Sequence, residues 1–75
     1  MNGENICSIF NEPYVGYGNN AWPFEGRCSD EANDLYVIPA RIMGVTPELV
    51  KKWGKAVVCN AIDMRLGRRP FLLKS

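Results

Sequence analysis

The stretch that most constrains the fold is residues 37–53, VIPARIMGVTPELVKKW, because it has the spacing of a helix-turn-helix. In that motif a small residue packs where two helices cross, a glycine allows the turn, and apolar residues hold the second helix against the first. Five residues stand at those positions: Ala40, Gly44, Val45, Val50 and Trp53. We therefore expect two helices in this stretch, with the Trp53 side chain inserted into the core.

The second helix has a clear start signal. Thr46 can accept a hydrogen bond from a free amide of the first turn, and Pro47 suits the first helical position. At about 100° per residue, Val50, Trp53 and Val57 share one side of this helix. The opposite side carries charged residues, namely Glu48, Lys51, Lys52 and Lys55. One side is thus expected to face a core, and the other to face water or phosphate.

The first helix is less clearly marked. Ser29 can cap a helical turn, since two acidic residues follow it. Pro39 pushes the residue before it towards extended geometry. We therefore expect a short strand over residues 35–38 and a helix that begins at Pro39. A kinked helix over residues 30–43 is the alternative.

The chain before Ser29 is punctuated by Gly, Asn and Pro. Residues 6–10 predict a brief strand, residues 14–17 are a second candidate, and residues 18–26 predict an ordered loop. Aromatic side chains in such a region usually pack on their own domain, but they can also anchor a partner protein. The candidate partner contacts are the aromatic residues Tyr14, Tyr17, Trp22 and Phe24.

The end of the chain allows two interpretations. The first is a single helix over residues 47–66, stopped by Gly67 in a left-handed conformation and followed by Pro70. In that helix Val58 and Ile62 would fall on the same side as the lysines. Only a helix that is buried on nearly all sides would tolerate such a pattern.

The second interpretation ends the helix near Val57 and continues as an antiparallel hairpin. Residues 62–66 then alternate between apolar and charged positions, and they pair with residues 69–73. Gly67 and Arg68 form the turn of this hairpin. We prefer the hairpin to the long helix.

The length and composition predict one small domain, residues 1–75, near the lower size limit at which one core stabilises a fold. Residues 1–34 form an acidic, aromatic, loop-rich N-terminal part, and residues 35–75 form a basic part. No apolar run approaches the roughly 18 residues of a membrane span. The first residues, MNGENICSIF, also lack the features of a signal peptide. We expect a cytoplasmic protein that does not bind membranes.

Catalytic and metal sites are not indicated. Three widely spaced cysteines, Cys7, Cys28 and Cys59, and no histidine argue against a complete disulfide framework and against a zinc site. We expect buried, reduced thiols. The sequence has no Gly-rich phosphate loop and no nucleophile elbow, so we expect neither a cofactor nor an enzyme.

The net charge of +1 conceals a division between the two halves. Residues 1–37 carry one basic and six acidic side chains, a net charge of −5, whereas residues 38–75 carry eight basic and two acidic side chains, a net charge of +6. Such an asymmetry suggests a polyanion as the partner of the basic half. It also permits the two halves simply to attract each other.

With this pattern, residues 35–75 resemble the small winged helix-turn-helix proteins that include phage excisionases and AlpA-type regulators. In that family a hairpin wing follows the helix-turn-helix, often with a Gly-Arg-rich turn, and here it corresponds to residues 61–75, AIDMRLGRRPFLLKS. The resemblance implies an α+β winged helix-turn-helix domain that binds double-stranded DNA. It also implies a phage or mobile-element protein that acts as an excisionase-like architectural factor or in transcription regulation.

The candidate DNA contacts lie on the second helix and on the expected wing. They are Thr46, Glu48, Lys51, Lys52, Lys55, Arg65, Arg68 and Arg69. The cations would hold phosphates, and Thr46 or Glu48 could contact a base edge. The alternative function is that of a small phage or plasmid protein that inhibits a host enzyme or defence complex through its acidic, aromatic first half.

Overall fold

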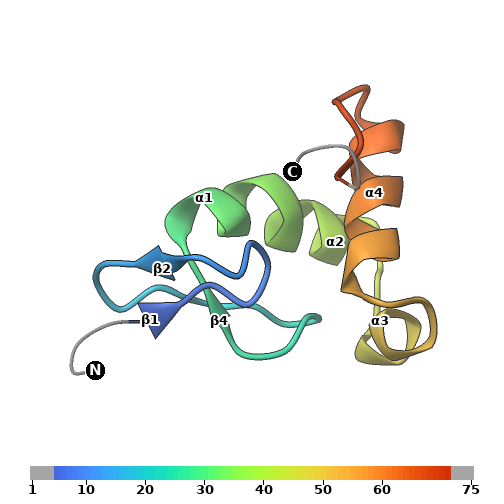
Figure 1. Ribbon diagram of the computed structural model, residues 1–75. Coiled ribbons are helices and arrows are strands. Elements are labelled where there is room, and N and C mark those ends of the chain that lie inside the picture. The colour runs from blue at the N-terminus through green and yellow to red at the C-terminus, as the bar shows by residue number, and fades with distance from the viewer. Residues whose placement is uncertain (1–4, 72–75) are drawn as a thin grey trace.

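The computed structural model describes residues 5–71 and mixes short strands with helices, as expected for an α+β chain (Figure 1). Two antiparallel hairpins come first: β1 (Asn5–Ile6) pairs with β2 (Pro13–Tyr14), and β3 (Asn19–Asn20) pairs with β4 (Arg27–Cys28). The helices follow in the order α1 (Asp30–Ala32), η1 (Asn33–Val37), α2 (Ile38–Ile42), α3 (Pro47–Trp53) and α4 (Lys55–Arg65). None of these helices is long and apolar enough to cross a membrane.

One helical run, made of α1, η1 and α2, lies across the hairpins (Figure 1). Ser29 Oγ accepts a hydrogen bond from Ala32 N at 3.2 Å, which confirms the predicted cap. The strand expected over residues 35–38 is wrong, and the alternative of a distorted helix from residue 30 is confirmed. The distortion is η1, a π-helical segment directly before α2, and such segments accommodate irregularities inside helices.

Pro39 stays inside this helical run although it has no N–H to donate. In an α-helix that N–H would bond to the carbonyl oxygen four residues earlier, which is Leu35 O. Arg68 Nη2 donates a hydrogen bond to Leu35 O at 2.6 Å. A side chain from the far end of the chain thus bonds to the carbonyl that the proline cannot reach.

The predicted turn and the start of the second helix are confirmed. Gly44 has a φ of 79°, a left-handed conformation that favours glycine. Val45 N donates to Ala40 O at 2.9 Å, and the Ala40 side chain is fully buried. Thr46 Oγ1 accepts from Leu49 N at 3.2 Å, and Pro47 is the first residue of α3.

This cap predicts a measurable loss of stability. Replacing Thr46 by alanine should lower the free energy of unfolding by about 0.5–2 kcal/mol, because Leu49 N–H loses its acceptor. Thr46→Ser keeps the oxygen and should remain close to the original chain. Urea unfolding followed by circular dichroism compares the two variants, and equal stability of the Ala and Ser variants would contradict the capping role.

The hairpin expected near the C-terminus is wrong, because α4 runs from Lys55 to Arg65 through Asp63. The positions buried in it, Val58, Cys59, Ile62 and Asp63, follow a helical period rather than the alternation of a strand. Gly67, with a φ of 73°, ends the helix as the long-helix alternative requires. The second half of the expected returning strand, residues 72–73, lies outside the described residues.

Gly54 makes α3 and α4 two helices instead of one. Its φ of 92° interrupts the run, and α4 restarts at Lys55 in a new direction (Figure 1). The apolar side of α4 is therefore no longer tied to the sides of α3. This removes the objection that a single helix would need to be buried on nearly all sides.

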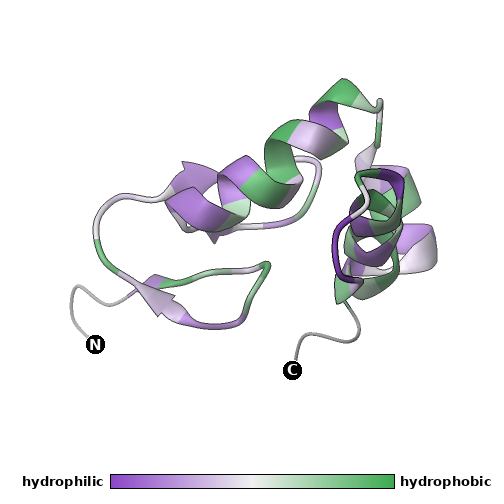
Figure 2. Cartoon of the chain, turned by 90° about the horizontal axis from the view of Figure 1, so that it is seen from above, coloured by the Kyte–Doolittle hydropathy of each residue, from purple (hydrophilic) through white to green (hydrophobic). Residues whose placement is uncertain are grey.

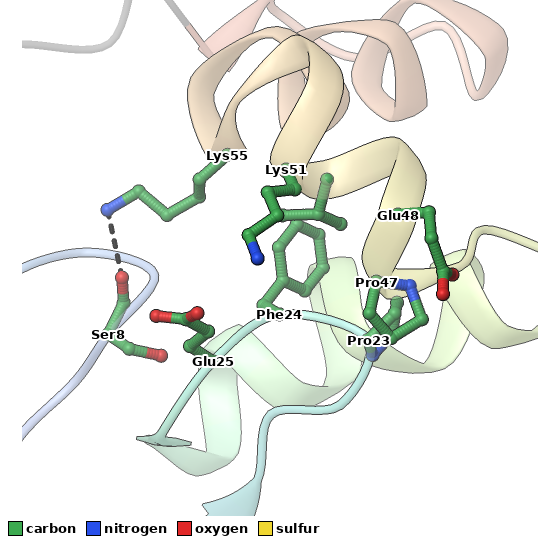
Figure 3. Close-up of a pocket in the computed structure, with 9 residues that line it drawn as sticks. Ser8, Pro23, Phe24, Glu25, Pro47, Glu48, Lys51 and Lys55 are labelled. Carbon is green, nitrogen blue, oxygen red and sulfur yellow. Dashed lines mark hydrogen bonds between the residues drawn. The ribbon is translucent and has the colours of Figure 1, made fainter.

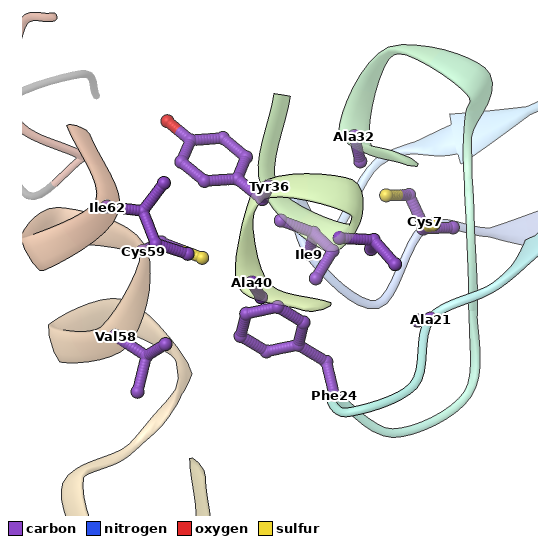
Figure 4. Packing of buried hydrophobic residues seen from close by; sticks show 12 residues of the cluster. Cys7, Ile9, Ala21, Phe24, Ala32, Tyr36, Ala40, Val58, Cys59 and Ile62 are labelled. Carbon is purple, nitrogen blue, oxygen red and sulfur yellow. The ribbon is translucent and has the colours of Figure 1, made fainter. Parts of the chain in front are cut away.

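The core lies where the hairpins, the first helical run and α4 meet (Figure 4). Tyr36 and Ala40 of the helical run lie between α4 on one side and the N-terminal segments on the other, and Phe24 is also buried. The prediction that Trp53 is inserted into the core is wrong, since its side chain is 56 % exposed. Val45 and Val50 pack against the core in its place, as partly buried side chains.

Candidate functional site

The candidate DNA contacts fall into two groups in the structure. Lys55 and Arg68 are held within the chain: Lys55 Nζ donates to Ser8 O at 2.8 Å, and Arg68 bonds to Asp63 and Leu35. The exposed group comprises Thr46, Glu48, Lys51, Lys52, Arg65 and Arg69. Arg68 therefore does not project freely from a wing turn.

Arg68 belongs to a buried polar network around Asp63, whose side chain is fully buried. Arg68 Nε lies 2.9 Å from Asp63 Oδ1, and Tyr36 Oη donates to Asp63 Oδ2 at 2.6 Å. The guanidinium carbon of Arg68 lies 5.2 Å from the centre of the Tyr36 ring. Burial raises the pKa of Tyr36, and the bond to Asp63 raises it further, so the hydroxyl stays protonated and donates. This network joins α4 to the first helical run.

The sequence interpretation missed this network because it treated Asp63 as an isolated charge on a strand. A signal was present. Asp63 follows Ile62 and stands four residues after Cys59, so on a helix it belongs to the same apolar side. An acidic residue at such a position needs a partner, because an unpaired buried charge is very costly.

The remaining basic residues with internal bonds belong to the framework. Arg27 donates to Tyr17 O and Gly18 O, and Arg41 donates to Trp22 O and Asn20 O. Across residues 5–71, four cations have no such bond: Lys51, Lys52, Arg65 and Arg69. All four come from α3, α4 and the segment after α4, so the basic character of the second half reaches the surface.

The acidic half does not neutralise these cations through contact. Within the described part of the chain the salt bridge found is Arg68–Asp63, and both of its partners lie in the second half. The exposed acidic residues of the first half are Glu12, Glu25, Asp30, Glu31 and Asp34. No salt bridge joins the two halves among the described residues, although Glu25 of the first half lines the same pocket as Lys51 and Lys55.

A pocket of about 550 Å³ opens between the loop that carries Phe24 and the start of α3 (Figure 3). Its charged lining residues are Glu25, Glu48, Lys51 and Lys55, two acids and two bases. The Lys55 ammonium already donates to Ser8 O. Because the charges balance and one is engaged, the pocket does not favour a ligand of either sign.

A groove of about 330 Å³ lies on the other side of α3, between α3, α4 and the end of α2. Eight of the nine described residues that line it are apolar, and the ninth is Arg65. Leu49 and Trp53 of α3 and Val57 of α4 line it while remaining 41 %, 56 % and 47 % exposed. Lys52 Nζ lies 5.4 Å from the centre of the Trp53 ring. We call this feature the Trp53 groove.

Figure 2 colours the chain by hydropathy, so the apolar residues of the helices can be compared. Apolar residues recur along α2 and α4, which pack on the core. By contrast, α3 has no buried residue at all, so its apolar residues Leu49 and Trp53 remain in contact with water. Exposed apolar side chains that cluster in this way are typical of interaction surfaces.

The aromatic candidates of the first half do not form one surface. Phe24 is buried in the core, and Tyr14 packs against it as a partly buried side chain. Tyr17 is 94 % exposed and lines a shallow hollow with Tyr14, Asp30 and Glu31, whereas Trp22, 49 % exposed, lies outside that hollow.

The three cysteines pack in the core. All three are buried and none forms a disulfide. Burial raises the pKa of Cys28 to about 11, and the nearby Cys7 raises it as well, so Cys28 stays a thiol at neutral pH. Among the described residues, no group of three or more His, Cys, Asp or Glu side chains could hold a metal ion.

Comparisons with protein-family models, with curated proteins and with solved structures found no match. The resemblance to excisionases and AlpA-type regulators stays a prediction. Any function must therefore be argued from the geometry of these surfaces.

Proposed function

We propose that the chain is a small DNA-binding protein that contacts double-stranded DNA through α3. The observation that supports this proposal is the position of α3, which follows α2 after the turn at Gly44, the order expected of a helix-turn-helix, and has no buried residue. In DNA-binding proteins of that kind the second helix enters the major groove. Here such a helix would present Glu48, Lys51 and Lys52 to the DNA.

The distribution of cations supports the same partner. Lys51, Lys52, Arg65 and Arg69 have no bond to other residues of the described chain that would occupy their charge. They would supply phosphate contacts, which give affinity without reading sequence. Glu48, exposed on α3, can accept a hydrogen bond from a cytosine amino group. Lys55 and Arg68 are not among the proposed DNA contacts, because they bond to other residues of the chain.

The resemblance to excisionases and AlpA-type regulators implies a biological role. The resemblance now rests on the expected helix-turn-helix, since residues 61–65, the start of the expected wing, belong to helix α4. The proposed role remains that of an excisionase-like architectural factor or transcription regulator of a phage or mobile element, acting in the cytoplasm. Such a protein would work without cofactor or catalysis.

The proposal is tested by the salt dependence of DNA binding. The chain should bind a labelled random duplex at low salt, with an affinity that falls as salt rises. The double variant Lys51→Ala/Lys52→Ala should bind more weakly, and its salt slope should be smaller by up to about two units. Fluorescence anisotropy over a sodium chloride series measures both quantities, and the melting temperature should stay the same.

The matched control changes the net charge equally at a distant place. Val15 and Tyr17 are 98 % and 94 % exposed in the first half, so Val15→Glu/Tyr17→Glu also shifts the net charge by two without touching the core. This control should bind DNA more tightly than the lysine variant. Equal losses in the two variants would mean that α3 makes no contact, and a parent chain that fails to bind at low salt would refute DNA binding.

Protein binding is the second candidate function, and the specific observation that favours it is the exposed Trp53. The expected inhibitor surface in the first half is reduced to Tyr17 and Trp22, because Phe24 is a core residue. An inhibitor of a host enzyme or defence complex would therefore use the Trp53 groove more readily than the aromatic residues of the first half.

A further inference from the structure

We propose that the Trp53 groove binds an amphipathic helix of a partner protein whose apolar face is flanked by acidic side chains. The inference does not rest on DNA binding, because it concerns another side of α3. Leu49 and Trp53 stand four residues apart and line the groove, whereas Glu48 and Lys51 line the pocket on the opposite side. Leu49 and Trp53 can therefore be changed without changing Glu48 or Lys51, whereas Lys52 and Arg65 belong both to the groove and to the proposed DNA contacts.

The exposure of Trp53 is the first argument. Burial of a tryptophan gives a large gain, yet this chain leaves more than half of the side chain in water. Leu49 and Val57 continue the same apolar surface along α3 and α4. Tryptophan is enriched among the residues that dominate the energy of protein interfaces. The groove therefore presents an anchor residue that the fold itself does not use.

The shape of the groove selects a helix as its occupant. Its walls are α3, α4 and the turn after α2, and the backbone N–H and C=O groups of the helices bond within each helix. An extended peptide would find no strand edge here, and its own backbone groups would lie unpaired against apolar side chains. A helix satisfies its own backbone and inserts side chains spaced at i, i+3, i+4 and i+7. The volume of about 330 Å³ suits a few large apolar side chains of that kind.

The cations beside the groove favour a partner helix that has acidic side chains next to its apolar face. Among the described residues that line the groove Arg65 is charged and none is acidic, and Lys52 lies beside the Trp53 ring. Acidic side chains on either side of an apolar helix face would therefore meet cations as the helix docks. A second copy of this chain fits less well, since a two-fold interface would bring the Lys52 and Arg65 side chains of both copies together.

Two stapled helical peptides with the same apolar face test the proposal. One carries glutamates beside that face and the other carries lysines. The glutamate peptide should bind the full chain, and the lysine peptide should bind at least about tenfold more weakly at low salt. Trp53→Ala should lower the affinity for the glutamate peptide by about tenfold or more. Trp22→Ala truncates a similarly exposed tryptophan and should leave the affinity for this peptide unchanged.

A charge reversal gives a readout that a purely structural role of Trp53 would not move. Arg65→Glu should shift the preference towards the lysine peptide, with an unchanged circular dichroism spectrum. Equal binding of both peptides, or a larger loss in Trp22→Ala than in Trp53→Ala, would overturn the proposal. A dimer in analytical ultracentrifugation that Trp53→Ala abolishes would make a second copy the occupant instead. If Trp53→Ala weakens the binding of duplex DNA as much as it weakens the binding of the peptide, the groove is instead a nucleic-acid site.

Discussion

Replacing Arg68 by alanine should lower the free energy of unfolding by about 3–5 kcal/mol, because the Asp63 carboxylate would stay buried without its cation. Asp63 is fully buried, and Arg68 Nε lies 2.9 Å from its Oδ1 atom. The variant would also lose the bond to Leu35 O near Pro39. So large a loss is a substantial part of the 5–15 kcal/mol that stabilises a typical domain. Urea denaturation followed by circular dichroism measures it.

Two further variants separate the buried pair from the general effect of removing a cation. Arg69→Ala removes the same charge from the neighbouring exposed residue and should change the stability by no more than about 0.5 kcal/mol. Adding Asp63→Asn to Arg68→Ala removes the uncompensated charge and should recover part of the loss. Arg68→Ala and Arg69→Ala chains with the same urea midpoint would show that the pair does not stabilise the fold.

Signals that depend on a few neighbouring residues were predicted correctly from the sequence. The Ser29 and Thr46 caps, the turn at Gly44 and the start of α3 are all in place, and Gly67 ends a helix as the alternative to the hairpin required. Each follows from the local geometry of one turn or one helix end. They determine where helices begin and end, but not which sides of them face each other.

Features that depend on distant residues were predicted wrongly. Pro39 was expected to push the residue before it towards extended geometry, yet Ile38 keeps helical φ and ψ angles, and Arg68 donates to Leu35 O. Residues 62–66 alternate like a strand, yet Cys59 and Ile62 also follow a helical period, and a segment this short does not decide between the two. The packing of α4 on Tyr36 and Ala40 decides it (Figure 4).

The candidate site shows the same limit. The charge division between the halves is visible in the sequence and persists on the surface. Which cations remain available is not visible, because Lys55 is engaged by Ser8 and Arg68 by Asp63. The Trp53 groove also escaped prediction, since it depends on the break at Gly54 that turns α4 away from the direction of α3.

Phe24→Ala should lower the free energy of unfolding by about 3–5 kcal/mol, whereas Trp53→Ala should change it by less than about 1 kcal/mol. The sequence assigned these residues the opposite roles, with Trp53 in the core and Phe24 as a candidate partner contact. In the structure Phe24 is 4 % exposed and Trp53 is 56 % exposed. Truncating Phe24 leaves a cavity in the core, while truncating Trp53 removes a side chain that already contacts water.

The comparison stays informative if Phe24→Ala fails to fold. Phe24→Leu keeps most of the side-chain volume and should cost less than about 1.5 kcal/mol, so it remains measurable by urea denaturation. A Trp53→Ala chain that unfolds more easily than Phe24→Leu would place Trp53 in the stabilising core after all. The Trp53 groove would then be part of the packing of α3 on α4, and its exposed tryptophan would no longer indicate a partner helix. A stable Trp53→Ala chain that loses the acidic peptide would instead show that Trp53 serves binding and not folding.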